Sequence, residues 1–177
     1  MAKWNRYVIG PNSEGKSHII STEPSVIKEE AGNFYRIDHW CTSEMPVDNG
    51  IEADRALDSK TRAPLPNGTV IRALQLMPDS HDAEEHRASI AKLHKEVGQT
   101  RMPSAADYQR HPSMHRTDTL DYIICVQGEI YLMTDLDEVL MKPGDVTVIR
   151  GVNHGWSNRS NAPALLIGVM VDAIPQP

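Results

Sequence analysis

The chain has 177 residues, of which 24% are charged and 40% hydrophobic, and its formal net charge is −6. This length suits one ordinary domain with its own core, and the acidic balance offers no basic face that would neutralise nucleic-acid phosphates. We therefore expect a small organic molecule or another protein as the partner, and no nucleic acid. Two cysteines without a CxxC pair predict neither a disulfide framework nor a structural zinc site.

The first residues, MAKWNRYVIG, lack the apolar region of a signal peptide, and no run of about eighteen apolar residues follows. We therefore expect a cytoplasmic protein without a membrane span.

The first half of the chain predicts short strands joined by turns. Two β-prone runs between Tyr7 and Ile20 flank the turn-rich PNSEGK, which is typical of a hairpin. Residues 34–42 and 69–77 predict two further strands, and the prolines and glycines of residues 45–68 favour a meandering loop between them.

Residues 10–17 match the phosphate-loop pattern GxxxxGK[ST], which would suggest a small kinase. That loop works only when it opens a helix, and here Ser17 is followed by HIISTEP, which leaves no room for one. We instead predict a turn between two strands, with Gly15 at a positive φ.

Residues 82–97 predict the one substantial helix. Asp82 and Glu85 have the spacing of an N-cap and its partner, Gly98 supplies the stop, and the apolar residues recur at helical spacing: Ile90, Leu93 and Val97. His81, His86 and His94 lie on or beside this helix, where a solvated polar face is their plainest explanation. A polar loop is expected to follow the helix.

From Thr119 onward, short strands follow one another at even spacing. None of the connections has room for a crossover helix, so the strands are expected to pair as antiparallel neighbours in a barrel or jelly roll: TLDYIICV, EIYLMTD, EVLM, DVTVIR and ALLIGVMVDA. Strand parity places Asp121, Ile123 and Cys125 on one face of their strand, so if Asp121 points into the barrel, the other two do as well.

Two segments combine histidines with an acidic residue and glycines. They are HPSMHRTDTLDYIICVQG, residues 111–128, and GDVTVIRGVNHGWSN, residues 144–158. These segments resemble the two motifs of the cupin superfamily, and MHRTDTLDY with RGVNHGWSNRS resembles a subgroup of small cupins found in biosynthetic and catabolic gene sets. The resemblance implies an all-β antiparallel cupin barrel (double-stranded β-helix, or jelly roll) with an N-terminal strand extension and one short helix. We divide this compact domain into N-terminal strands (1–78), a helix and loop insertion (79–112) and the cupin barrel motifs (113–177).

The resemblance also implies a metal site. Anchored on Gly128, the family's Glu position falls on Asp121, its first His on His115 and its second His on Thr117, while the second motif supplies His154. The set His115, Asp121 and His154 is a two-histidine, one-carboxylate arrangement, which suits iron(II), with zinc, manganese or nickel as alternatives.

Four further residues are candidates for substrate binding: Thr117, Cys125, Arg150 and Trp156. Thr117 would hydrogen-bond a bound water, while Trp156 and Arg150 would clamp an aromatic ring or an anionic oxygen, although barrel packing and a surface ion pair explain these two equally well. Cys125 would line the pocket as a small hydrophobe. His111 is an alternative ligand that would have to bend in from its loop.

The reading favoured by these motifs is a metal-dependent cupin enzyme acting on a small organic substrate in secondary metabolism or catabolism. It would be an oxygenase, or a decarboxylase, isomerase or cyclase that uses the metal as a Lewis acid. A metal-free enzyme with Asp121 and His154 as acid and base, and a non-catalytic small-molecule-binding cupin, remain alternatives. The family resemblance also implies a homodimer.

Overall fold

The computed structural model describes residues 4–25, 27–30, 34–50, 53–57, 59, 61–99 and 101–175. Its main body is a pair of antiparallel sheets. The larger has the order β3 (Ile27–Glu30), β4 (Phe34–Cys41), β5 (Thr69–Leu76), β11 (Ala164–Asp172), β6 (Thr119–Gln127) and β9 (Val146–Arg150). The smaller has the order β10 (Gly155–Ser157), β7 (Ile130–Met133) and β8 (Glu138–Met141).

The core lies between the two sheets, as the predicted jelly roll requires. Its buried residues come from both: Ile123, Cys125, Ile130, Leu132, Met141, Ile149, Trp156, Ala164 and Leu166. Strand β6 has the predicted parity, because Asp121, Ile123 and Cys125 are buried whereas Tyr122 and Ile124 are exposed. The all-β antiparallel architecture is therefore confirmed.

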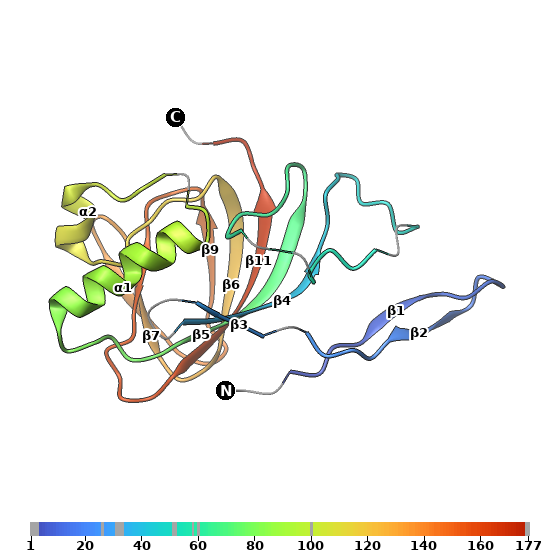
Figure 1. Cartoon of the computed structure of the whole chain (residues 1–177), viewed down its shortest axis with the longest axis horizontal. Coiled ribbons are helices and arrows are strands. Elements are labelled where there is room, and N and C mark those ends of the chain that lie inside the picture. Colours follow the sequence, from blue (N-terminus) through green and yellow to red (C-terminus); the bar gives the residue numbers. More distant parts are fainter. Residues whose placement is uncertain are drawn as a thin grey trace.

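A separate hairpin, β1 (Val8–Pro11) and β2 (Ser17–Ser21), projects away from the sheets (Figure 1). Its turn is closed by hydrogen bonds between Asn12 and Lys16, and Gly15 has a φ of 75°, as predicted. The segment that matches the phosphate-loop pattern is thus a turn between paired strands and opens no helix, which removes the basis for a kinase.

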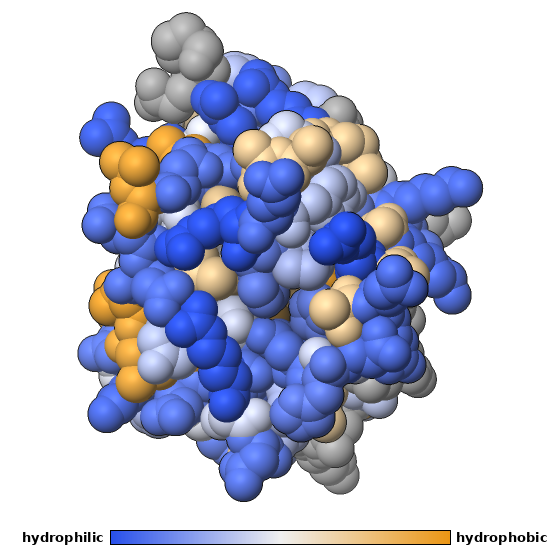
Figure 2. Space-filling model, turned by 90° about the vertical axis from the view of Figure 1, so that its left-hand side faces the viewer, coloured by the Kyte–Doolittle hydropathy of each residue, from blue (hydrophilic) through white to orange (hydrophobic). Residues whose placement is uncertain are grey.

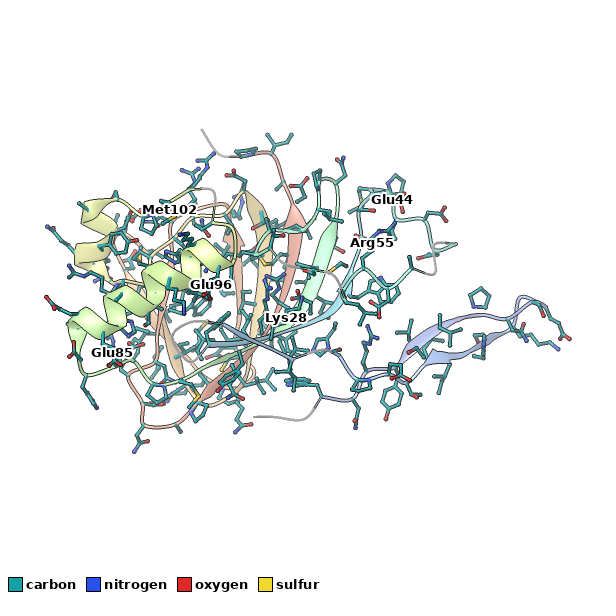
Figure 3. The ribbon with its side chains drawn as sticks, in the orientation of Figure 1. Lys28, Glu44, Arg55, Glu85, Glu96 and Met102 are labelled. Carbon is teal, nitrogen blue, oxygen red and sulfur yellow. The ribbon has the colours of Figure 1, made fainter. Side chains whose placement is uncertain are left out.

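Two helices lie on the side of the barrel opposite to this hairpin (Figure 1). Helix α1 (Ala83–Glu96) has the predicted N-cap, Asp82, which accepts hydrogen bonds from the backbone N–H groups of residues 84 and 85. The predicted N3 partner, Glu85, bonds to another residue. Glu85, labelled with Glu96 in Figure 3, accepts a hydrogen bond from the Ser80 hydroxyl at 3.0 Å.

The expected polar loop after α1 in fact contains a second short helix, α2 (Ala105–Arg110). Its capping box pairs Ser104 with Asp107, where the usual box has Glu or Gln, so the pattern was not recognised. Strands β3 and β10 were also not predicted; β10 has 3 residues, too few for a visible period of two.

A buried ion cluster on strands β4 and β5 centres on Asp38, a residue that is 2% exposed, and its Arg72 side chain borders the cavity described below. Arg72 Nε lies 3.0 Å from one carboxylate oxygen, and Lys28 Nζ, labelled in Figure 3, lies 3.6 Å from the other. Arg72 also donates to the backbone carbonyl of Arg62 at 2.7 Å. A buried charge is tolerated when it is paired in this way, so the cluster ties β4, β5 and the loop before β5 together.

Among the described residues, no helix has the length and apolar character needed to cross a membrane.

Candidate active site

The barrel encloses a cavity of about 460 Å³ between the larger sheet, β10 and helix α1. Helix α1 supplies one wall through a stripe of residues spaced at helical intervals: His86, Ile90, Leu93, His94 and Val97. Figure 2 shows the helix-bearing side of the molecule, which is mostly hydrophilic and is hollowed near its centre. A helix laid across one end of the barrel thus leaves an interior space large enough for a small organic molecule.

His115 and His154 are paired neighbours in the wall of this cavity. They form an isolated antiparallel bridge, in which each backbone N–H donates to the other residue's carbonyl, at 2.7 and 2.9 Å. Gly155 permits the approach, since a Cβ there would lie 2.9 Å from Ser113 Oγ and 3.1 Å from the backbone nitrogen of Met114. Residues paired in this way point to the same face, and the two imidazole centroids are 4.4 Å apart.

The hydrogen bonds of the two rings orient their free nitrogens. Nδ1 of His115 lies 2.8 Å from the carbonyl oxygen of Ser113, and Nδ1 of His154 lies 3.0 Å from that of Val152. A carbonyl oxygen can only accept, so each Nδ1 carries the proton and donates it. Each Nε2 is then left with a free lone pair, which is the tautomer of a metal-binding histidine.

Burial keeps both rings neutral. Desolvation lowers the pKa of His154 from 6.5 to about 4, and it holds the pKa of His115 well below its usual value, with the nearby Arg62 charge acting in the same direction. A neutral imidazole is the form that binds a metal.

Asp121, on β6, contributes a carboxylate to the same cavity. The residue is 3% exposed, and burial raises the pKa of its carboxyl group against the opposing effect of the Thr119 and Thr117 hydroxyls. Its Oδ1 is buried without a hydrogen-bond partner within the described residues. Such an orphaned oxygen is costly to bury unless something else occupies its lone pairs.

The three predicted metal ligands therefore line one cavity. Of the four predicted substrate contacts, some lie in the cavity wall and others elsewhere. Trp156 lines the cavity wall, with its ring centroid 6.2 Å from that of His154. Arg150 is exposed on β9, and Cys125 is packed in the core with its thiol near the carbonyl oxygen of Gly128 at 3.7 Å. Thr117 is buried and accepts a hydrogen bond from the Thr119 hydroxyl at 2.8 Å.

Of these four, the cavity wall includes only Trp156 among the described residues, so the expected clamp by Arg150 and the pocket position of Cys125 are corrected. Strand parity placed Cys125 inside the barrel correctly, but the barrel interior is divided between a packed core and the cavity.

The expectation for His94 was wrong. This side chain is 1% exposed, lines the cavity, and has its ring centroid 5.8 Å from that of His115. Burial lowers its pKa from 6.5 to about 4. The sequence carried a signal that was not used: His94 adjoins Leu93 and lies four residues after Ile90, on the edge of the helix's apolar stripe.

A second cluster lies nearer the outside: Asp79, His86 and His111 have ligand atoms that all lie within 4.8 Å of one another. His115, Asp121 and His154 do not form such a group in the part of the chain that is described. His111 Nε2 lies 3.4 Å from Asp79 Oδ2, which accounts for the His111 position, and His111 does not bend into the cavity.

The hydrogen bonds of this outer cluster differ from those of the inner pair. Nδ1 of His86 accepts the backbone N–H of Ser80, and Nδ1 of His111 accepts that of Ser113, both at 3.2 Å. A neutral ring that accepts at Nδ1 carries its proton on Nε2, so this nitrogen has no free lone pair for a metal. Nε2 of His111 faces the Asp79 carboxylate, whereas Nε2 of His86 is buried without a hydrogen-bond partner among the described residues. The short distances between ligand atoms thus favour the outer cluster as a metal site. The tautomers of the histidines favour the inner set, His115, Asp121 and His154.

Comparison with known proteins points to the same region of the chain. Residues 100–171 match the family model described as "Cupin domain". Phomopsin biosynthesis cluster protein C' of Diaporthe leptostromiformis is 45% identical over 64 residues, which are 35% of this chain and 34% of that protein. The match thus spans about a third of that relative's length.

Longer alignments have lower identity. Cupin-domain-containing oxidoreductase virC of Hypocrea virens is 26% identical over 96% of this chain and 76% of its own length. The oxidoreductase fogC of Aspergillus ruber is 26% identical over 94% of this chain and 71% of its own. Among solved structures, the cupin domain of Schizosaccharomyces pombe Cnp3 has a TM-score of 0.48 at 10% identity, over 97% of this chain and 89% of that one.

Proposed function

We propose that the chain, whose residues 100–171 match the cupin-domain model, is a cupin and a metal-dependent enzyme that transforms a small organic molecule inside the barrel. The ligands are His115, Asp121 and His154, and iron(II) is the favoured ion. The relatives named oxidoreductases support an oxidoreductase, and the biosynthesis-cluster relative supports a role in secondary metabolism.

One observation carries the metal proposal: three residues that line the same cavity each have a ligand atom with an unused electron pair. Both histidines are neutral and offer Nε2, because backbone carbonyls hold their Nδ1 protons. Asp121 offers an Oδ1 that no group among the described residues satisfies. Since their ligand atoms are not all within 4.8 Å, binding requires these side chains to turn toward one another.

A bound divalent ion would supply either oxygen activation or Lewis-acid polarisation of a substrate oxygen. The chain's own residues then have separate tasks. Trp156, Ile123 and Leu93 give the cavity apolar surface that excludes water and holds the carbon skeleton of a substrate. The carbonyls of Ser113 and Val152 keep the two imidazoles in the tautomer that leaves Nε2 free.

Elemental analysis of protein purified without chelators or an affinity tag tests this proposal. We expect near-stoichiometric metal in the unmodified protein and its loss in Asp121→Asn and His154→Gln, while His81→Gln, at an exposed position beside α1, retains it. Protein that stays metal-free after incubation with iron(II), manganese, nickel and zinc would contradict the proposal. A substrate turned over fully after chelation would instead favour Asp121 and His154 as acid and base, and binding without turnover a non-catalytic cupin.

We further propose a homodimer formed through the outer face of the larger sheet. That face exposes apolar side chains on two adjacent strands: Tyr122, Ile124, Val126, Val146 and Val148. The projecting hairpin in Figure 1 also exposes apolar side chains: Tyr7, Ile9, Ile19 and Ile20. An isolated two-stranded hairpin is marginally stable, and contiguous apolar surface marks an interface.

Light scattering tests the dimer. The double variant Ile124→Lys and Val148→Lys should be monomeric, whereas Leu136→Lys, on an exposed loop away from this face, should not change the mass. A monomeric unmodified protein would contradict the proposal.

A further inference from the structure

We propose that His94, on helix α1, is a third imidazole ligand of the metal, and that it supplies from the helix what the barrel motif lacks at Thr117. This inference rests on the proposed function. It differs in its source, since the other ligands lie on or beside barrel strands whereas His94 lies on the helix that covers one end of the cavity.

The first argument is the free-energy cost of burying the His94 ring without a hydrogen-bond partner for Nδ1. The side chain is 1% exposed, and its Nδ1 is buried without a hydrogen-bond partner within the described residues. A buried polar atom without a partner is rare and calls for a specific reason, such as an ion. Of the neighbouring histidines, His81 is exposed to solvent, and His86 is half-buried, with a backbone partner for Nδ1 but none for Nε2 among the described residues. His94 alone of these three combines full burial with an unused Nδ1.

The second argument is distance. Two imidazoles that bind one ion through a nitrogen each, at about 2.1 Å, have ring centroids roughly 4.5 to 6.5 Å apart as the angle at the ion opens from about 90° to 180°. The ring centroids of His115 and His154 are 4.4 Å apart, just below this range, and those of His94 and His115 are 5.8 Å apart, within it. The ligand atoms are not all within 4.8 Å, so side chains have to turn, but these two pairs of rings already have centroid spacings close to those of imidazoles that share an ion.

The third argument concerns Thr117, the residue at the missing histidine's position. Its hydroxyl accepts from Thr119 at 2.8 Å, and Thr117 is not part of the cavity wall. It therefore leaves one side of the site without a ligand. Helix α1 fills the cavity wall with His94, next to Leu93 and one turn before Val97. Ligation by His94 would tie the helix to the barrel.

The test compares cobalt(II) and zinc(II) binding by chelator-stripped unmodified protein, His94→Gln and the control His81→Gln. We expect His94→Gln to weaken binding by at least about tenfold and to alter the cobalt(II) absorption spectrum, as loss of a ligand should exceed the effect of losing a ligand's hydrogen-bond partner. The control should match the unmodified protein. Equal affinity and an unchanged spectrum in His94→Gln would overturn the inference while leaving the proposed function intact.

A second measurement does not depend on the variant's folding. Pulsed electron paramagnetic resonance of copper(II)-loaded unmodified protein counts the coordinated imidazoles. Three coordinated imidazoles support ligation by His94, and two overturn it.

Hydrogen exchange is a further measurement. Exchange in α1 should slow when zinc(II) is added, and unchanged exchange in α1 would count against the link between helix and barrel. If the unmodified protein binds none of these ions, both the proposed function and this inference are contradicted.

Discussion

Lowering the pH should destabilise the chelated protein from about pH 6.5 downward, because the buried histidines resist protonation. The folded protein holds the pKa of His154 and of His94 at about 4, whereas both are 6.5 without burial. Between these values the unfolded chain binds more protons than the folded one, so the free energy of unfolding falls as the pH falls.

The difference of roughly 2.5 pKa units corresponds to about 3 kcal/mol per histidine once the pH is well below 4, and to roughly 2 kcal/mol at pH 5. The two residues together would remove about 4 kcal/mol at pH 5, a large share of a typical domain stability of about 5 to 15 kcal/mol. Asp121 acts in the opposite sense, since its raised pKa favours the folded state as the pH falls, and it offsets part of the loss.

Urea unfolding followed by circular dichroism at pH 7.5, 6 and 5, in the presence of a chelator, measures this dependence. His154→Gln and His94→Gln should each reduce the loss of stability between pH 7.5 and pH 5 by roughly 2 kcal/mol. A loss of the same size in both variants and in the unmodified protein would refute the assignment of the acid sensitivity to these rings.

Three further changes test the structure. His94→Leu should raise the free energy of unfolding of the chelated protein by about 1 kcal/mol, because it removes a buried nitrogen that has no partner; a destabilised variant would contradict this. Asp38→Asn should cost about 3 to 5 kcal/mol in urea unfolding, since it leaves the buried Arg72 without its counter-ion, and a loss under about 1 kcal/mol would show that the cluster is dispensable. Gly128→Ala should lower the free energy of unfolding by about 2 kcal/mol or more, because Gly128 has a φ of 74° and a Cβ there would lie 2.6 Å from the Pro163 carbonyl oxygen. The midpoint of thermal unfolding measures this effect, and an unchanged midpoint would refute the prediction.

The sequence by itself determined the elements whose signal is local. Alternation along residues 119–127 predicts which side chains share a face of the strand, and Gly15 within PNSEGK predicts the hairpin turn. Asp82 and Gly98 delimit α1 because capping chemistry involves neighbours a few residues away. The resemblance to the cupin motifs singled out His115, Asp121 and His154, and all three line one cavity.

Only the tertiary structure decided what fills the inside of the barrel. Cys125 and Asp121 share one strand and one parity, yet Cys125 meets the core and Asp121 meets the cavity, because the opposite sheet and α1 close different parts of the interior. His94 is on a polar-looking helix, and its burial depends on where that helix docks. Periodicity reports which side chains share a face of a helix or a strand, but not what that face packs against, since packing joins residues far apart in the chain.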